Sequence, residues 1–135
     1  MKDETRTWLR YSEENLRSAA LLLDSGLFNP CLQNAQQSVE KALKALLVEF
    51  SLRFEKTHSI AALNALLENQ RIHIELTQDD CELLDSIYLP SKYPLGSVLP
   101  DFEPDEAICR RCVEIAERTC DCVLRYLEKK REEKT

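Results

Sequence analysis

The spacing of the apolar residues is the feature that most limits how this chain can fold. Between residues 29 and 50 they recur at three- and four-residue steps, which places them along one face of an α-helix. The same spacing recurs over residues 3–24, 60–70, 77–88 and 105–130. Only two glycines occur in 135 residues, and β-branched residues are sparse, which also favours helix over strand. The sequence therefore predicts an all-α fold.

The residues between these segments have the chemistry of helix ends. Gly26 suits the left-handed end of the first helix, and Pro30 suits the first turn of the second. Thr57 or Ser59 can cap the third helix. A single long irregular stretch, residues 89–104, holds four of the five prolines. Helices joined mostly by short connectors predict an up-and-down bundle of four main helices plus one short helix.

Length and composition indicate a single globular domain, which we place at residues 1–130, followed by a charged, frayed tail at 131–135. The longest purely apolar run, residues 19–23, is too short to span a bilayer. The N-terminus lacks the apolar stretch of a signal peptide, so we expect a cytoplasmic protein with no membrane partner. The net charge of −6 argues against a protein that coats nucleic acid by charge alone, although it is compatible with a local basic patch.

Six cysteines raise the question of a metal site. Zinc ligands usually sit in pairs on turns, whereas Cys109, Cys112 and Cys120 recur at helical spacing inside the last predicted helix. We interpret these three as small core residues with free thiols, and we predict neither a metal nor any other cofactor. Cys122 falls off this stripe, so we expect it to be partly exposed.

The histidines and the long connector supply candidates for chemistry. His58 either hydrogen-bonds the start of the third helix or serves as a general acid–base group or phosphate contact, since imidazole titrates near neutral pH. His73 has no neighbouring group that carries chemistry, and we interpret it as a surface residue. Lys92 and Tyr93 lie in the long connector, where Tyr93 either stacks on a base or closes the end of the bundle.

The polar side of the second predicted helix is rich in amides. Gln33, Gln37, Lys41 and Lys44 are spaced by four, four and three residues and so share one face. Glu40 and Lys44 form a favourable i,i+4 pair. Such a face is usually solvated, but amide-rich faces also suit contact between subunits. We predict that Gln33, Gln37, Glu40 and Lys41 line an interface.

Three segments resemble the HEPN domain, a helical module found beside minimal nucleotidyltransferases and in bacterial toxin–antitoxin pairs. They are "AQQSVEKALKALL" (residues 35–47), "KTHSIAAL" (56–63) and "KYP" (92–94). The first is similar to the family's helix-two signature of a glutamine, a Glu-Lys pair and a following lysine. The resemblance covers residues 8–127. It implies a four- or five-helix bundle that commonly dimerises, with a cleft bordered by the second helix and the loop before the last one.

Many HEPN proteins are metal-independent ribonucleases with an arginine, a polar residue and then a histidine near the last helices. Arg53 and His58 match that spacing, but they lie before the third helix, and Phe54 stands where the polar residue is usual. No histidine follows Tyr88. Related proteins often have "RYP" where this chain has "KYP", and the lysine loses the bidentate fork of arginine. The resemblance therefore favours a protein without catalytic activity.

We accordingly predict a non-catalytic HEPN protein that forms a homodimer and binds a nucleotide, a partner minimal nucleotidyltransferase, or both, in a pair similar to a toxin–antitoxin system. One alternative is a metal-independent endoribonuclease toxin that uses Arg53 and His58 on RNA. Another is a purely structural partner subunit. The residues predicted to contact the nucleotide or its phosphate are Lys41, Lys44, His58, Lys92 and Tyr93.

Overall fold

The computed structural model describes residues 1–88 and 103–133, and every regular element in these two ranges is an α-helix. Three helices are long, whereas α3 and α4 have nine and eleven residues. The predicted all-α bundle is confirmed, and each predicted helix is present. The helices are α1 (Asp3–Asp24), α2 (Phe28–Glu49), α3 (Ile60–Glu68), α4 (Gln78–Tyr88) and α6 (Glu106–Glu133).

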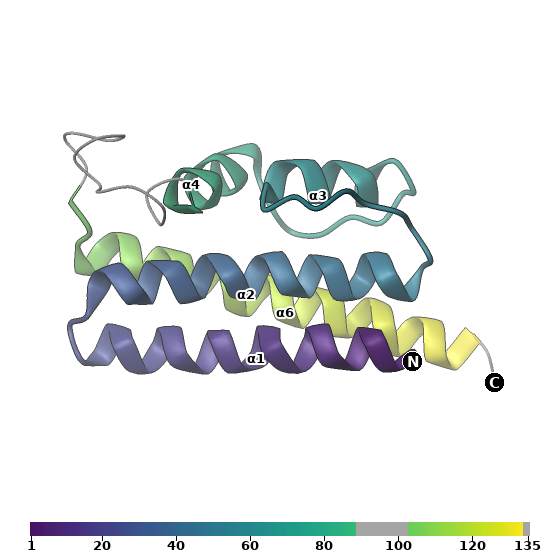
Figure 1. Cartoon of the computed structure of the whole chain (residues 1–135), viewed down its shortest axis with the longest axis horizontal. Helices are drawn as coiled ribbons and strands as arrows, with labels where there is room; N and C mark the ends of the chain where they lie inside the picture. The colour runs from purple at the N-terminus through teal and green to yellow at the C-terminus, as the bar shows by residue number, and fades with distance from the viewer. Residues whose placement is uncertain (89–102, 134–135) are drawn as a thin grey trace.

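Helix α2 is the centre of the bundle. It packs against α1 and α6, and α3 and α4 lie along it as a further layer on the side away from α1 (Figure 1). Of its 22 residues, 14 are buried, so α2 contributes apolar and polar side chains alike to the interior. None of the described helices is long and apolar enough to cross a membrane.

Small polar residues bring α1 and α2 close together. The Ser12 hydroxyl donates to the Ser38 carbonyl oxygen at 2.6 Å, and the Ser38 hydroxyl donates to the Ser12 carbonyl oxygen at 2.9 Å. Both serines are fully buried, beside the Cys120 thiol of α6. This reciprocal pair satisfies both hydroxyls and fixes how α1 lies along α2.

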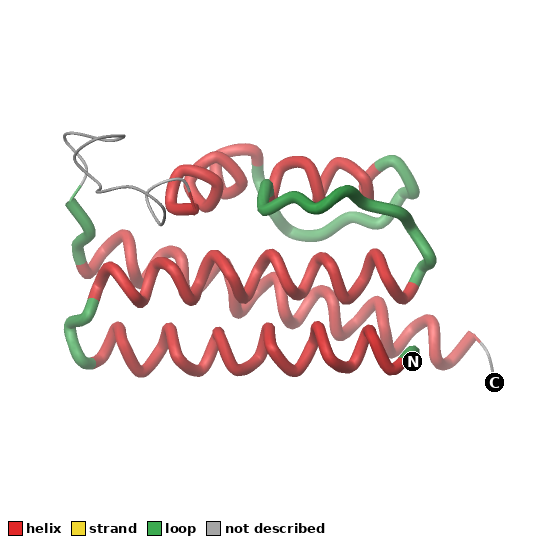
Figure 2. Tube along the Cα trace, in the orientation of Figure 1, coloured by secondary structure: helices red, strands yellow, loops and turns green. Residues whose placement is uncertain are grey.

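Local chemistry sets the helix ends. Gly26 follows α1 with φ +71°, which a residue without Cβ adopts at little cost. Ser59 caps α3 by accepting a hydrogen bond from the Ala62 N–H, as one of the two predicted caps. Thr77 and Asp80 cap α4 reciprocally, each side chain accepting from the other residue's N–H. The connector from α2 to α3, residues 50–59, is a long irregular loop (Figure 2).

The cysteines belong to the core. Cys109, Cys112 and Cys120 are buried as predicted. Burial raises the pKa of the Cys81 thiol to about 11 and the pKa of Cys109 and of Cys112 to about 12. Thiols in this state are protonated and inert. Among the described residues, no three His, Cys, Asp or Glu side chains converge as metal ligands.

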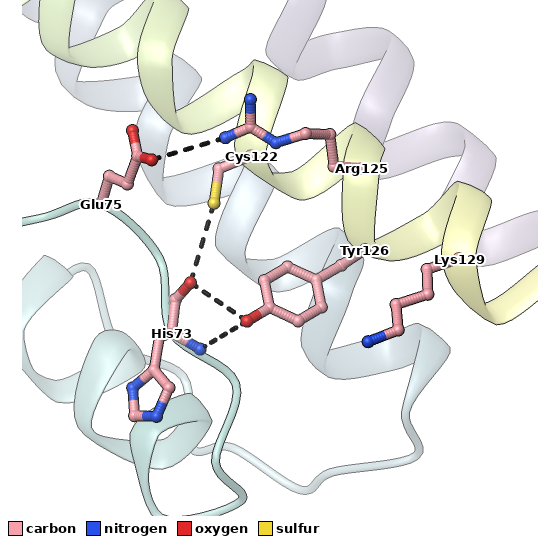
Figure 3. Close-up of a pocket in the computed structure, with 6 residues that line it drawn as sticks. All are labelled: His73, Glu75, Cys122, Arg125, Tyr126 and Lys129. Atoms are coloured by element: carbon pink, nitrogen blue, oxygen red, sulfur yellow. Dashed lines mark hydrogen bonds and ion pairs between the residues drawn. The ribbon is translucent and has the colours of Figure 1, made fainter.

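Cys122 is a correction, because its side chain is buried rather than partly exposed. The loop from α3 to α4 crosses over it, and its thiol points at the His73 carbonyl oxygen at 3.7 Å (Figure 3). The Tyr126 hydroxyl accepts from the His73 N–H at 2.9 Å and donates to the same carbonyl at 3.2 Å. These contacts hold the loop on α6. The side chain of His73 itself is exposed and points away from α6, as predicted for a surface residue.

Glu49 joins three elements at the end of the bundle where both termini lie (Figure 1). Its carboxylate accepts from the Lys2 N–H and from the Thr5 hydroxyl, each at 3.0 Å, and lies 3.8 Å from the Lys130 ammonium. Burial alone would raise the pKa of Glu49. The hydrogen bonds from Lys2 and Thr5 and the charge of Lys130 outweigh burial and lower it below the ordinary value of 4.5.

A lowered pKa in the folded state predicts a specific acid sensitivity. Glu49 stabilises the fold fully above the pKa of the unfolded chain, and this contribution is lost as the pH falls through the lower pKa of the folded state. We expect Glu49→Gln to reduce the free energy of unfolding at pH 7 by about 1–2 kcal/mol. Urea denaturation from pH 7 down to pH 3 should show the gap to the unmodified protein closing below about pH 4.5. A gap that stays constant with pH would contradict this account.

Candidate functional site

A groove of about 860 Å³ opens between the first turns of α1, the middle of α2, the connector from α2 to α3, and the end of α4. It has more than twice the volume of the cavity of about 320 Å³ beside His73 (Figure 3). The groove exists because α2 is packed on one side by α1 and on another by α3 and α4. Its lining comprises three lysines (Lys41, Lys44 and Lys56), three aromatic rings (Trp8, Phe54 and Tyr88), and Gln37, Glu40, Thr57 and His58.

A buried carboxylate lies at the bottom of the groove. One oxygen of Glu40 is 3.1 Å from the Lys44 ammonium, and the other is 3.0 Å from Nδ1 of His58. The Glu40 and Lys44 side chains are only 7% and 8% exposed, whereas the His58 side chain is 49% exposed. Glu40 and Lys44 therefore do not form the solvated ion pair that is usual on such a helix face. His58 is therefore the most exposed member of this set.

Gln36 of the same helix contacts Glu40 and the connector without lining the groove. Its amide donates, at 3.4 Å in each case, to the Glu40 carboxylate and to the backbone carbonyl of His58. Its side chain is almost fully buried. Gln36 therefore joins the connector to α2, and its amide forms its hydrogen bonds within the subunit.

Helix α4 holds the connector from the other side. Asp85 accepts hydrogen bonds from the N–H groups of Ile60 and Ala61, at 2.6 and 3.2 Å, and from the Ser59 hydroxyl at 3.1 Å. One turn further, the Tyr88 ring stacks on the His58 ring with 4.4 Å between centroids and 19° between planes. A carboxylate at the start of α3 is also favourable for the helix dipole. Residues 85 and 88 thus fix the backbone and the ring of the segment that carries His58.

Lys41 is a different kind of cation from Lys44. Its ammonium donates to the side-chain oxygens of Asn15 at 2.7 Å and Gln37 at 3.4 Å, and it lies 5.8 Å from the centre of the Tyr11 ring. These partners are neutral, and within the described residues no carboxylate forms an ion pair with Lys41. The Lys44 charge is compensated by Glu40, so Lys41 supplies an uncompensated positive charge to the groove.

The structure brings together Lys41, Lys44 and His58, three of the residues predicted to contact a nucleotide, in this groove. Lys92 and Tyr93, the other two, lie outside the described residues. His58 does not hydrogen-bond the start of α3, because Ser59 and Asp85 already do so.

Of the predicted interface residues, Gln37, Glu40 and Lys41 line the groove, whereas Gln33 does not. Arg53 is exposed and also does not line the groove, so the structure does not join it to His58 there. The interface role of these side chains stays a prediction.

Several lining residues were not recognised in the sequence. The helical spacing of residues 3–24 predicts an ordinary apolar side chain at Trp8, yet it is half-buried and its ring centre lies 5.4 Å from the Lys44 ammonium. Phe54 and Lys56 sit in an irregular connector, where no periodicity indicates a direction. Tyr88 ends a predicted helix, and no spacing rule pairs it with a histidine in another element. The mixture of lysine and aromatic residues near His58 was the available signal.

Fold and groove together define a helical-bundle protein with a groove lined by lysines and aromatic rings. A model of the HEPN domain family matches residues 5–130, and the chain belongs to this family. That family includes nucleotide-binding members and ribonuclease toxins. No curated protein matches the chain.

Solved structures share the fold, among them the following two. The crystal structure of ST0689, an archaeal HEPN homologue, has a TM-score of 0.59 and 24% sequence identity, covering 91% of this chain and 96% of its own. The crystal structure of TT1696 from Thermus thermophilus has a TM-score of 0.62 and 23% identity, covering 92% of this chain and 98% of its own. The similarity extends over the whole bundle.

Glu40→Ala tests how much the buried pair contributes to folding. The change leaves the Lys44 ammonium buried without its carboxylate, and losing one partner of a buried ion pair costs about 3–5 kcal/mol. We expect a decrease of that size in the free energy of unfolding, measured by urea denaturation.

The matched control is Glu106→Ala. Glu106 and Arg110 have the same i,i+4 spacing, but their side chains are 64% and 58% exposed. An exposed pair of this kind contributes about 0.5 kcal/mol. Equal losses in the two variants would show that burial adds nothing to the Glu40 interaction.

Proposed function

We propose that this HEPN protein binds a nucleotide in the groove and has no catalytic activity. The observation that carries the proposal is the composition of the lining, which joins three lysines and one carboxylate to three aromatic rings in a chain of net charge −6. Lysines attract phosphate, and aromatic rings offer faces on which a base can stack. Lys41 and the exposed Lys56 are the cations available to phosphate, since Glu40 already neutralises Lys44.

The test is nucleotide binding by isothermal titration calorimetry, with AMP and ATP as probes. We expect Lys41→Ala to weaken binding about five-fold, since one partly exposed charge contact is worth about 1 kcal/mol. Affinity should also fall as salt is raised, because the contact is electrostatic.

Lys129→Ala is the control, since Lys129 lies at the separate cavity beside His73 and its loss removes the same charge from the chain. It should leave the affinity unchanged. Equal weakening in the two variants would indicate a non-specific effect of charge. Failure of AMP and ATP to bind or to raise the unfolding temperature would refute the proposal.

The ribonuclease alternative uses Arg53 and His58. It is supported by the half-exposed imidazole in the groove, but Arg53 lies outside the lining. We expect no cleavage of labelled RNA by the purified protein. Cleavage that disappears in His58→Ala and persists in His73→Ala would instead establish the ribonuclease.

The proposal also includes assembly as a homodimer and with a minimal nucleotidyltransferase, as the family resemblance implies. Gln37 is exposed and Gln33 is half-buried, and the Gln33 side chain makes no hydrogen bond within the described part of the chain. Amides in this state can complete hydrogen bonds to another chain. Light scattering on the purified protein tests the first assembly, and co-purification with a minimal nucleotidyltransferase tests the second. If the protein is a monomer and co-purifies with no such enzyme, both assembly proposals fail. The proposed groove then belongs to a single subunit.

A further inference from the structure

The contact between Glu40 and His58 determines where the imidazole carries its proton. The Glu40 oxygen lies 3.0 Å from Nδ1 of His58. The Lys44 ammonium, 3.1 Å from the other oxygen, favours the ionised carboxylate. An ionised carboxylate only accepts hydrogen bonds, so Nδ1 must be the atom that donates. In the neutral ring, Nε2 then carries a lone pair and no hydrogen.

The contacts of His58 leave Nε2 without a hydrogen-bond partner among the described residues. Tyr88 covers a face of the ring, and Nδ1 is taken by Glu40. The side chain is 49% exposed and lines the groove. A neutral His58 therefore offers the groove a hydrogen-bond acceptor among lysines that only donate.

We propose that Glu40 is a positioning residue that holds His58 in the Nδ1–H tautomer, so that Nε2 accepts a hydrogen bond from a hydroxyl or amino group of the bound nucleotide. This inference rests on the proposed function, because the nucleotide supplies the donor. The proposal assigns different chemical groups of the ligand to different residues. Phosphate oxygens accept, so they pair with Lys41 and Lys56, whereas a sugar hydroxyl or a base amino group donates and pairs with His58. His58 then selects for a neutral part of the ligand rather than for its charge.

The tautomer is measured directly by ¹⁵N NMR of the protein labelled at histidine. The chain has two histidines, so His73→Phe leaves His58 as the only signal. At pH 8, where an ordinary imidazole is neutral, we expect Nε2 to show the shift of an unprotonated ring nitrogen and Nδ1 that of an N–H. Free imidazole side chains favour the opposite tautomer, so the result is diagnostic. An Nε2–H tautomer or a doubly protonated ring at this pH would overturn the assignment.

Glu40→Gln tests the positioning role itself. The amide NH₂ can donate to Nδ1, which allows the ring to place its proton on Nε2. We expect the NMR signals to move toward the Nε2–H tautomer in this variant. In Glu40→Leu residue 40 can neither accept nor donate, so unchanged signals in that folded variant would show that Glu40 does not set the tautomer. The spectrum of the protein with native Glu40 decides the assignment even if this variant does not fold.

The ligand contact is tested with AMP and three analogues that each lack one donor: 2′-deoxy-AMP, 3′-deoxy-AMP and purine riboside monophosphate, which has no amino group. We expect at least one analogue to bind about five-fold more weakly, the value of one hydrogen bond at a half-exposed site. The weakened analogue identifies the sugar hydroxyl or the base amino group as the donor.

His58→Phe keeps a ring to stack on Tyr88 but has no acceptor, so the preference should vanish in it and persist in His73→Phe. Equal binding of AMP and all analogues, or a preference that survives His58→Phe, would overturn the contact. If AMP and its analogues do not bind at all, the proposed function fails and the ligand contact fails with it. The NMR measurement separates that outcome from a wrong tautomer, because it needs no ligand.

Discussion

Glu40 places a buried carboxylate between the Lys44 ammonium and the His58 imidazole, where α2 passes the connector to α3. A buried charge is tolerated only when it is paired and hydrogen-bonded, so the connector must keep covering Glu40 in one arrangement. Gln36 adds a second tie from α2 to the same segment. The groove depends on this interaction, because it joins the His58 side chain to α2, while Gln36 and Asp85 hold the backbone of the connector.

Helix α2 therefore serves the core and the site at once. Its apolar residues are buried in the core, while Gln36 and Glu40 contact His58 of the connector. Lys44 pairs with Glu40 and lies beside Trp8 of α1. The site is rigid, since these polar residues belong to the most buried helix of the bundle. The same arrangement explains why the glutamine-rich face has mixed uses: the Gln36 amide is bound inside the subunit, and Gln37 supports Lys41.

Much of this fold could be predicted from the sequence, because helices obey a local period. The spacing of Ala35, Val39, Ala42 and Leu46 determines which side of α2 is buried, whatever packs against it. The site could be predicted only in part. The i,i+4 spacing pairs Glu40 with Lys44, but His58 reaches Glu40 through an irregular connector that has no period. Cys122 illustrates the same limit, since the loop that covers it comes from a distant segment.

The charge of the groove contrasts with the charge of the whole chain, and this contrast bears on its chemistry. A protein of net charge −6 repels polyanions at a distance. Lys41 keeps a local positive charge because its partners, Asn15 and Gln37, are neutral amides. The Lys44 charge is neutralised by Glu40, so the groove holds fewer unpaired positive charges than the number of its lysines. A small anion with an aromatic part can enter and satisfy both the charge and the rings, whereas a long polyanion would meet the acidic surface outside. The electrostatics of the chain therefore agree better with the proposed mononucleotide than with an extended nucleic acid.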